Sequence, residues 1–228
     1  MGGRVGLFAL FLGVVFSIGC GGGGSSSSSD TAQIRVFNGA SGVSAVNILV
    51  DGTLQSGNLN YGAATQYLTV KTGSIHVQAV LASDGSSVLD QSFSIASGAH
   101  ETVFITGTSA SVTSKVLGDG GTTTVAGDGH VRVFNASNTM GASDVYIVDP
   151  GRGLSGVTPV AKGIGLGSDS GYQAIPAGNY EVFLTAPGTT IVNLATGPLN
   201  LTSATTNQTV VVFDAAQGGF TFILLTDQ

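Results

Sequence analysis

Histidine is the first residue type to examine for chemistry, because it ligates metals and titrates near neutral pH. The chain has 3 histidines, His76, His100 and His130. No two of them have the HxH, HxxxH or HExxH spacing that brings two ligands to one zinc ion. His76 alternates with apolar residues, and His100 begins another apolar stretch. The pattern predicts solvated strand histidines and no bound metal.

Serine could supply a nucleophile, but its surroundings do not favour one. No Gly-x-Ser-x-Gly elbow joins a strand to a helix, and the nearest segment, GLGSDSG (165–171), reads as a loop that enters a strand. The glycines of GIGLG (163–167) are not followed by Lys-Ser/Thr or by a helix, so they predict turns and no phosphate loop. We therefore expect no hydrolase and no nucleotide cofactor.

Carboxylates are equally uninformative about catalysis. Glu101 and Glu181 are the only glutamates, although most glycosidases need a pair of carboxyl groups that act together. The segments GDGG (118–121) and GDGH (127–130) contain oxygen ligands but lack the spacing and the distal glutamate of a calcium loop. These observations predict a protein that is not an enzyme and holds no metal.

Cys20 is the only cysteine, and it has a clear chemical context. It follows Arg4 and the apolar run VGLFALFLGVVFSIG (5–19), which is typical of a secretory signal. The run is shorter than the ~20 residues that a transmembrane helix needs. A signal peptide over residues 1–19 is therefore predicted.

The segment SIGC (17–20) resembles the lipobox of bacterial lipoproteins, although Ser17 stands where leucine is usual. In lipoproteins the cysteine thiol is acylated and becomes the mature N-terminus, so the resemblance implies that Cys20 carries lipid such as palmitate. Gly21 follows, where aspartate would favour the inner membrane, and this implies the outer membrane. The alternative is a conventional signal peptide with an incidental Cys20.

Residues 21–30, GGGGSSSSSD, extend this interpretation. Glycine and serine bury no apolar area that could offset the entropy of ordering the chain. Together with Cys20 they predict a flexible tether over 20–30 that holds a folded part away from a membrane.

The elements that would position any site occur twice. The motif Arg-Val-Phe-Asn stands at 35–38 and again at 132–135. Four further pairs of segments follow in the same order: AVNILVDG (45–52) with SDVYIVDPG (143–151), LNYGAATQYLTVKTGSIHVQAV (59–80) with IGLGSDSGYQAIPAGNYEVFLT (164–185), ETVFITG (101–107) with QTVVVFD (208–214), and VTSKVLGD (112–119) with FTFILLTD (220–227). We expect two domains, at 31–120 and 129–228, joined by a linker at 121–128, with an extended loop at 150–163.

Each copy has the pattern of short strands. Apolar and polar residues alternate with a period of two in 74–82 and in 179–186, which is typical of β-strands with one buried face. Seven or eight such strands per copy, with turns between them and no helix, predict an all-β fold of two tandem β-sandwiches. Arg35 and Arg132 are expected to run along the surface of the sheet and to snorkel toward solvent or pair locally.

The composition agrees with this fold and excludes some partners. Charged residues make up 9% of the chain, against about 25% in typical soluble proteins, and there are 36 Gly and no Trp. The net charge of −6 repels nucleic acid.

The ordered motifs resemble a bacterial cell-surface family known only as a domain of unknown function, whose members open with an RVxNASPDAPxVDVYVDG type of strand pair. The second copy matches through RVFNAS (132–137), DVYIVD (144–149) and IPAGNYEV (175–182), and the first through RVFNGAS (35–41), VNILVDG (46–52) and YGAATQYLTV (61–70). Both lack the Pro-Asp-Ala-Pro of the signature. The resemblance implies immunoglobulin-like or transthyretin-like sandwiches outside the cytoplasm, and it implies no activity and no functional residues.

Taken together, these patterns predict a non-catalytic lipoprotein of the bacterial cell envelope, anchored in the outer membrane and facing either the periplasm or the cell surface. Its two sandwiches would serve binding, adhesion or envelope structure, with a protein or glycan ligand. The alternative is a carbohydrate-binding accessory module. That function commonly uses exposed aromatic residues, and here 5 Tyr and 11 Phe must also supply much of the core.

Overall fold

A computed structural model describes residues 1–3, 30–120, 128–201 and 207–228 of the chain. These residues form 17 strands and no helix, which confirms the all-β prediction. Within the same ranges, no helix is long and apolar enough to span a membrane. Cys20 and most of the predicted signal peptide and tether lie outside the described residues.

The first sandwich consists of two four-stranded sheets. Sheet A has the strand order β4 (Leu68–Lys71), β1 (Thr31–Asn38), β7 (His100–Thr108), β8 (Ser111–Gly118). Sheet B has the order β3 (Thr53–Leu59), β2 (Val46–Val50), β5 (Gly73–Leu81), β6 (Ser87–Ile95). The inward residues of both sheets form one core; in β5 these are Ile75, Val77 and Ala79, the residues that the alternating pattern predicted.

The second sandwich repeats this arrangement with more strands. Sheet C contains β12 (Ser168–Asp169), β9 (Asp128–Asn135), β16 (Asn207–Asp214) and β17 (Phe220–Asp227), with β13 (Gln173–Pro176) also paired to β9. Sheet D has the order β11 (Ala161–Ile164), β10 (Ser143–Val148), β14 (Gly178–Thr185), β15 (Val192–Leu201). Its core lies between sheets C and D.

Both copies share one uncommon pairing. β1 pairs in parallel with β7, and β9 pairs in parallel with β16, while the other strand pairs are antiparallel. The register is also equivalent, because Arg35 lies opposite Thr102 and Arg132 lies opposite Thr209. Parallel strands are normally buried on both faces, and these four strands are buried along most of their length.

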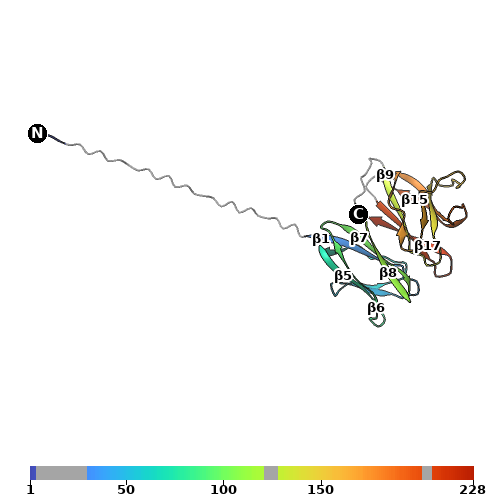
Figure 1. Cartoon of the computed structure of the whole chain (residues 1–228), viewed down its shortest axis with the longest axis horizontal. Helices are drawn as coiled ribbons and strands as arrows, with labels where there is room; N and C mark the ends of the chain where they lie inside the picture. The colour runs from blue at the N-terminus through green and yellow to red at the C-terminus, as the bar shows by residue number, and fades with distance from the viewer. Residues whose placement is uncertain (4–29, 121–127, 202–206) are drawn as a thin grey trace.

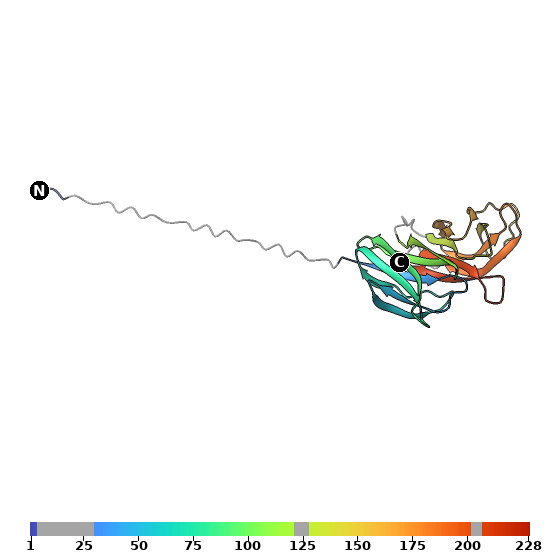
Figure 2. The ribbon, with the colours of Figure 1, turned by 60° about the horizontal axis from the view of Figure 1, so that its bottom comes forward.

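The two sandwiches pack through sheets A and C (Figures 1 and 2), so the molecule has four β-layers in the order B, A, C, D. The interface contains an apolar cluster in which Phe104 stacks on Phe134 with ring centroids 3.9 Å apart. Phe37 meets Phe213 edge-to-face at 5.7 Å. The central strands β1 and β7 of sheet A, and β9 and β16 of sheet C, are thereby covered on both faces.

Each residue of the repeated motif has a separate place in this arrangement. Val36 and Val133 point into the core of their own sandwich. Phe37 and Phe134 point the other way, into the interface. The side chain of Asn38 donates to the backbone oxygen of Leu59 at 3.2 Å, and so ties the end of β1 to the end of β3.

The extended loop of the second copy covers part of sheet D. Leu154 of this loop packs against Tyr146 and Val148 of β10, on the face turned away from the core. The insertion that the repeat comparison located at 150–163 therefore shields apolar residues that would otherwise face solvent.

Gly62 provides a test of the contact between the sandwiches. A Cβ atom there would lie 2.5 Å from the Phe213 ring of the other sandwich, at φ +76. Gly52 has the same φ of +76 and no neighbour within 4 Å. We expect Gly52→Ala to cost about 1 kcal/mol of unfolding free energy from backbone strain, and Gly62→Ala to cost about 1–3 kcal/mol more from the clash.

Urea denaturation of the two variants measures this difference, since the shared φ cancels the backbone term. Equal losses in Gly62→Ala and Gly52→Ala would contradict the packing of Phe213 on the first sandwich.

Candidate functional site

The most unusual polar feature is a group of four charged side chains at the interface, which we name the interdomain charge cluster: Arg35, Asp119, Arg132 and Asp227. All four residues are at most 4% exposed. Charged groups are almost never buried to this degree unless they are paired. Their partners therefore decide what the cluster can do.

Arg35 joins its own sandwich to the second one. Its Nε donates to Thr102 Oγ1 at 3.0 Å within sheet A. Its Nη1 donates to the backbone oxygen of Thr226 at 2.9 Å, and its Nη2 donates to Asp227 Oδ1 at 2.5 Å. The last two acceptors both belong to β17 of the second sandwich.

Arg132 makes the mirror set of contacts. Its Nε donates to Thr209 Oγ1 at 3.1 Å within sheet C. Its Nη1 donates to the backbone oxygen of Gly118 at 2.9 Å, and its Nη2 donates to Asp119 Oδ1 at 2.7 Å. Each sandwich therefore supplies the arginine that neutralises the aspartate of the other.

Two tyrosines complete the cluster in the same symmetric way. The Tyr67 hydroxyl donates to Asp119 Oδ2 at 2.8 Å, and the Arg35 guanidinium lies 4.7 Å from the centroid of the Tyr67 ring. The Tyr172 hydroxyl donates to Asp227 Oδ2 at 2.6 Å, with the Arg132 guanidinium 4.5 Å from its ring. Both arginines thus gain a cation–π contact in addition to their ion pairs.

The electrostatics keep the tyrosines protonated. Burial raises the pKa of Tyr67 and of Tyr172, and the nearby aspartates raise it further, so both hydroxyls remain donors at neutral pH. Burial also raises the pKa of Asp227, as does the charge of Asp119, although hydrogen bonds from Thr209 and Tyr172 oppose this rise. No buried nitrogen or oxygen of the four cluster side chains lacks a hydrogen-bond partner in the described structure.

The cluster therefore holds the two sandwiches together through ion pairs and hydrogen bonds that occupy its buried polar atoms. It also corrects the expectation that Arg35 and Arg132 lie on the sheet surface and pair locally. That expectation was wrong because the outer face of sheet A is covered by sheet C. The sequence repeat contained a signal for the cluster. When the two copies are aligned, Asp119 and Asp227 occupy equivalent positions, and so do Tyr67 and Tyr172.

The histidines divide between the two environments. His76 lies on the partly exposed face of sheet B, where its Nε2 is 2.5 Å from Asp90 Oδ1, and this agrees with the predicted solvated strand residue. His100 contacts the Tyr67 ring edge-on. His130 is only 4% exposed, so the prediction of solvation was wrong for it: β9 is buried on both faces. The described residues contain no group of three or more His, Cys, Asp or Glu side chains that could hold a metal ion.

The glycine-rich segments and the two glutamates do not assemble a site in the described structure. In GLGSDSG (165–171), Asp169 accepts from the Gly171 backbone nitrogen at 2.7 Å, and Gly167 has a φ of +73, as a turn requires. Glu101 belongs to β7 of sheet A, whereas Glu181 belongs to β14 of sheet D, so they do not form a carboxylate pair. Burial raises the pKa of Glu101. Asp119 of GDGG is part of the interdomain charge cluster, and residues 121–127 lie outside the described structure.

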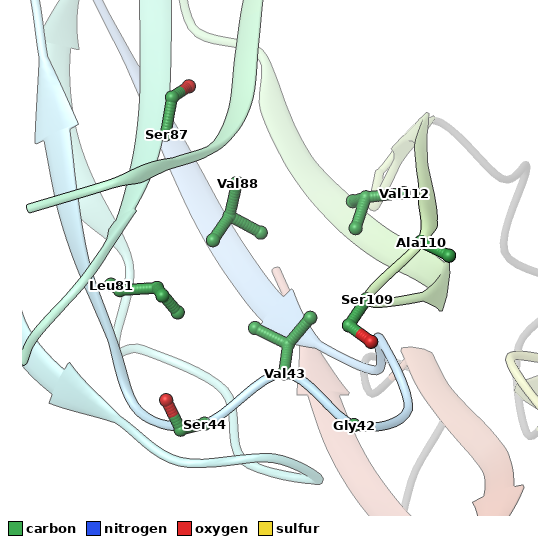
Figure 3. Close-up of a pocket in the computed structure, with 9 residues that line it drawn as sticks. All are labelled: Gly42, Val43, Ser44, Leu81, Ser87, Val88, Ser109, Ala110 and Val112. Atoms are coloured by element: carbon green, nitrogen blue, oxygen red, sulfur yellow. The ribbon is translucent and has the colours of Figure 1, made fainter.

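A pocket of about 360 Å³ opens at one end of the first sandwich, and we name it the end pocket (Figure 3). It is lined by Gly42, Val43, Ser44, Leu81, Ser87, Val88, Ser109, Ala110 and Val112. The side chains of Val43, Val88 and Val112 face a common space between β6, β8 and the loop after β1. These apolar residues continue the core of the first sandwich toward solvent. Sequence reasoning did not find this pocket.

Aromatic side chains are turned inward. All tyrosines and phenylalanines in the described ranges are buried or only partly exposed. None of them belongs to the exposed class that a sugar-binding platform on a sheet face commonly has.

This architecture defines a tandem β-sandwich protein whose two units are joined by reciprocal buried ion pairs. The chain belongs to the family described as "Domain of unknown function (DUF4397)", whose model matches residues 32–146 and 129–228. The two matches confirm, at the level of the family, the resemblance to a domain of unknown function present in two copies. No curated protein matches the chain.

Solved structures with a similar arrangement include the family CBM26 module of Eubacterium rectale Amy13K in complex with maltoheptaose, at 12% identity and a TM-score of 0.28, covering 87% of this chain and 97% of that one. A streptococcal virulence factor that binds α-glucan has 11% identity and a TM-score of 0.27, with coverage of 87% and 97%. A candidate cell adhesion protein from Bacteroides fragilis has 9% identity and a TM-score of 0.24, with coverage of 87% and 98%. Their ligands are properties of those proteins.

Removal of one arginine tests the reciprocal ion pairs between the sandwiches. Arg35→Ala would leave Asp227 buried without its main counterion, and we expect a loss of about 3–5 kcal/mol in unfolding free energy. Arg152 is exposed, so Arg152→Ala is the matched control, with an expected change within about 0.5 kcal/mol. Chemical denaturation measures both.

A double replacement of the pair, Arg35→Met with Asp227→Leu, removes both charges and is expected to be more stable than Arg35→Ala. If Arg35→Ala costs no more than Arg152→Ala, the arginine lies on the surface, as the sequence pattern had predicted.

Proposed function

We propose that this protein is a non-catalytic binding or adhesion module of the bacterial cell envelope. The observation that carries the proposal is the interdomain charge cluster. It holds the two copies of the repeat in one arrangement. Each buried charged group of the cluster is already paired with another group of the protein. Such a body is suited to presenting a fixed surface to a partner.

The envelope location is supported by the N-terminal segment. An apolar run followed by Cys20 and a Gly/Ser stretch favours export, acylation and a flexible tether. Gly21 after the cysteine favours the outer membrane. Lipidation of Cys20 would let the two sandwiches stand clear of the membrane and face either the periplasm or the cell surface.

Contacts with a partner are best assigned to the ends of the sandwiches. The central strands of sheets A and C are covered on both faces, and the loop with Leu154 covers part of sheet D. The end pocket is a concave, partly apolar surface of the size that small ligands or single side chains occupy. Binding at this end leaves the charge cluster untouched.

The lipid anchor is tested by substitution of its cysteine. We expect radiolabelled palmitate to be incorporated into the wild-type chain and not into Cys20→Ala, which should move from the membrane to the soluble fraction. Ser25→Ala, in the same tether, is the matched control and should keep both label and location. Unchanged membrane association of Cys20→Ala, with no label in the wild type, would rule out the anchor.

The carbohydrate alternative is tested on a glycan array. Because the described aromatic side chains are turned inward, we expect the purified Cys20→Ala chain to show no binding to neutral oligosaccharides, including maltoheptaose. Saturable binding of one glycan class would replace the adhesion proposal with a carbohydrate-binding module.

A further inference from the structure

Two apolar residues of the end pocket have larger counterparts at the equivalent positions of the second sandwich. Strand register identifies the equivalent residues: Gly107 of β7 pairs with Val112, and Asp214 of β16 pairs with Phe220. Phe220 thus takes the place of Val112, and it packs on the core of the second sandwich. A small valine in one copy corresponds to a large aromatic residue in the other.

The loop after the first strand shows the same substitution. Val43 follows Asn38 of the repeated motif at the spacing at which Met140 follows Asn135. Met140 is buried in the core of the second sandwich. Two larger side chains, both packed in the second core, therefore stand where the first copy has two valines at the pocket.

The lining of the end pocket restricts what can enter. It contains no charged residue and no Asn or Gln. Its side-chain polar groups are the hydroxyls of Ser44, Ser87 and Ser109, and none of them makes a hydrogen bond within the described part of the chain. A sugar would need more fixed donors and acceptors for its hydroxyls, whereas an apolar side chain needs mainly contact with Val43, Val88 and Val112.

Charge near the pocket favours a basic neighbour. The turn between Leu81 and Ser87, both of which line the pocket, carries the exposed Asp84. Hydrogen bonds from Ser86 lower the pKa of Asp84, so its carboxylate is charged at neutral pH. The whole chain has a net charge of −6, which also attracts basic segments.

We propose that the end pocket receives an apolar side chain of the size of phenylalanine or methionine from a partner polypeptide, with a lysine or arginine beside it. The proposal rests on the proposed binding function and names the chemistry of its partner. The chain's own Phe220 and Met140 show which groups fit a site of this shape.

The test uses methyl NMR of the purified Cys20→Ala chain with two probes, N-acetyl-Phe-Lys-amide and N-acetyl-Phe-Glu-amide. We expect chemical-shift changes concentrated on the methyl groups of Val43, Val88 and Val112. The lysine probe should bind about two- to five-fold more tightly at low salt, the range expected of one exposed ion pair. Asp84→Asn should remove this preference.

Reciprocal variants distinguish the pocket from nonspecific binding. Val112→Phe copies the second sandwich and should abolish the shifts, while Phe220→Val should open the second site and produce new shifts at the Met140 methyl. Val43→Met is a second closing variant, should Val112→Phe fail to fold. Unchanged methyl resonances in the other sandwich report that each variant is folded.

The proposal is overturned if neither probe shifts the pocket methyls, if Val112→Phe and Val43→Met bind as well as the parent, or if maltoheptaose shifts the same methyls and the peptides do not. Failure here is distinguishable from failure of the proposed function, because palmitate labelling and membrane association of the wild-type chain do not depend on the pocket.

Discussion

The reciprocal ion pairs between the two sandwiches are the interaction on which the rest of the structure depends. Arg35 neutralises Asp227, and Arg132 neutralises Asp119, across an interface in which all four residues are at most 4% exposed. Burial of these ions is costly, and the cost is offset only when every ion finds its partner in good geometry. The threonine, tyrosine and backbone contacts supply that geometry on both sides. A shift or rotation of one sandwich would leave buried charges unpaired, so the cluster sets the orientation as well as the contact.

Burial of the central strands of sheets A and C on both sides follows from this contact and agrees with the composition. The parallel pairs β1–β7 and β9–β16 are buried along most of their length, and β7 and β16 carry runs of consecutive apolar residues, at 103–105 and 210–213. Few charged residues are then needed, and most of the aromatic side chains that a sugar-binding sandwich would display are used in the interface and the cores. The surfaces left for recognition are the outer sheets and the sandwich ends.

The two copies have diverged at those remaining surfaces while keeping the shared interface. The second copy covers part of the outer face of sheet D with the loop that carries Leu154, and it packs Met140 and Phe220 on its core. The first copy keeps its end open at Val43 and Val112. The two units of this tandem repeat thus share one symmetric interface and differ in the surfaces that remain outside it.

The sequence by itself determined the strands, the repeat and the all-β class. Alternation with a period of two placed Ile75, Val77 and Ala79 in a core, because successive side chains of a strand point to opposite faces. Alternation also showed that Arg35 and Phe37 share a face. It could not show what covers that face, since this depends on a contact between segments far apart in the chain. Only the tertiary structure decided that the second sandwich lies there, and so turned an expected surface arginine, and the buried His130, into parts of an interior.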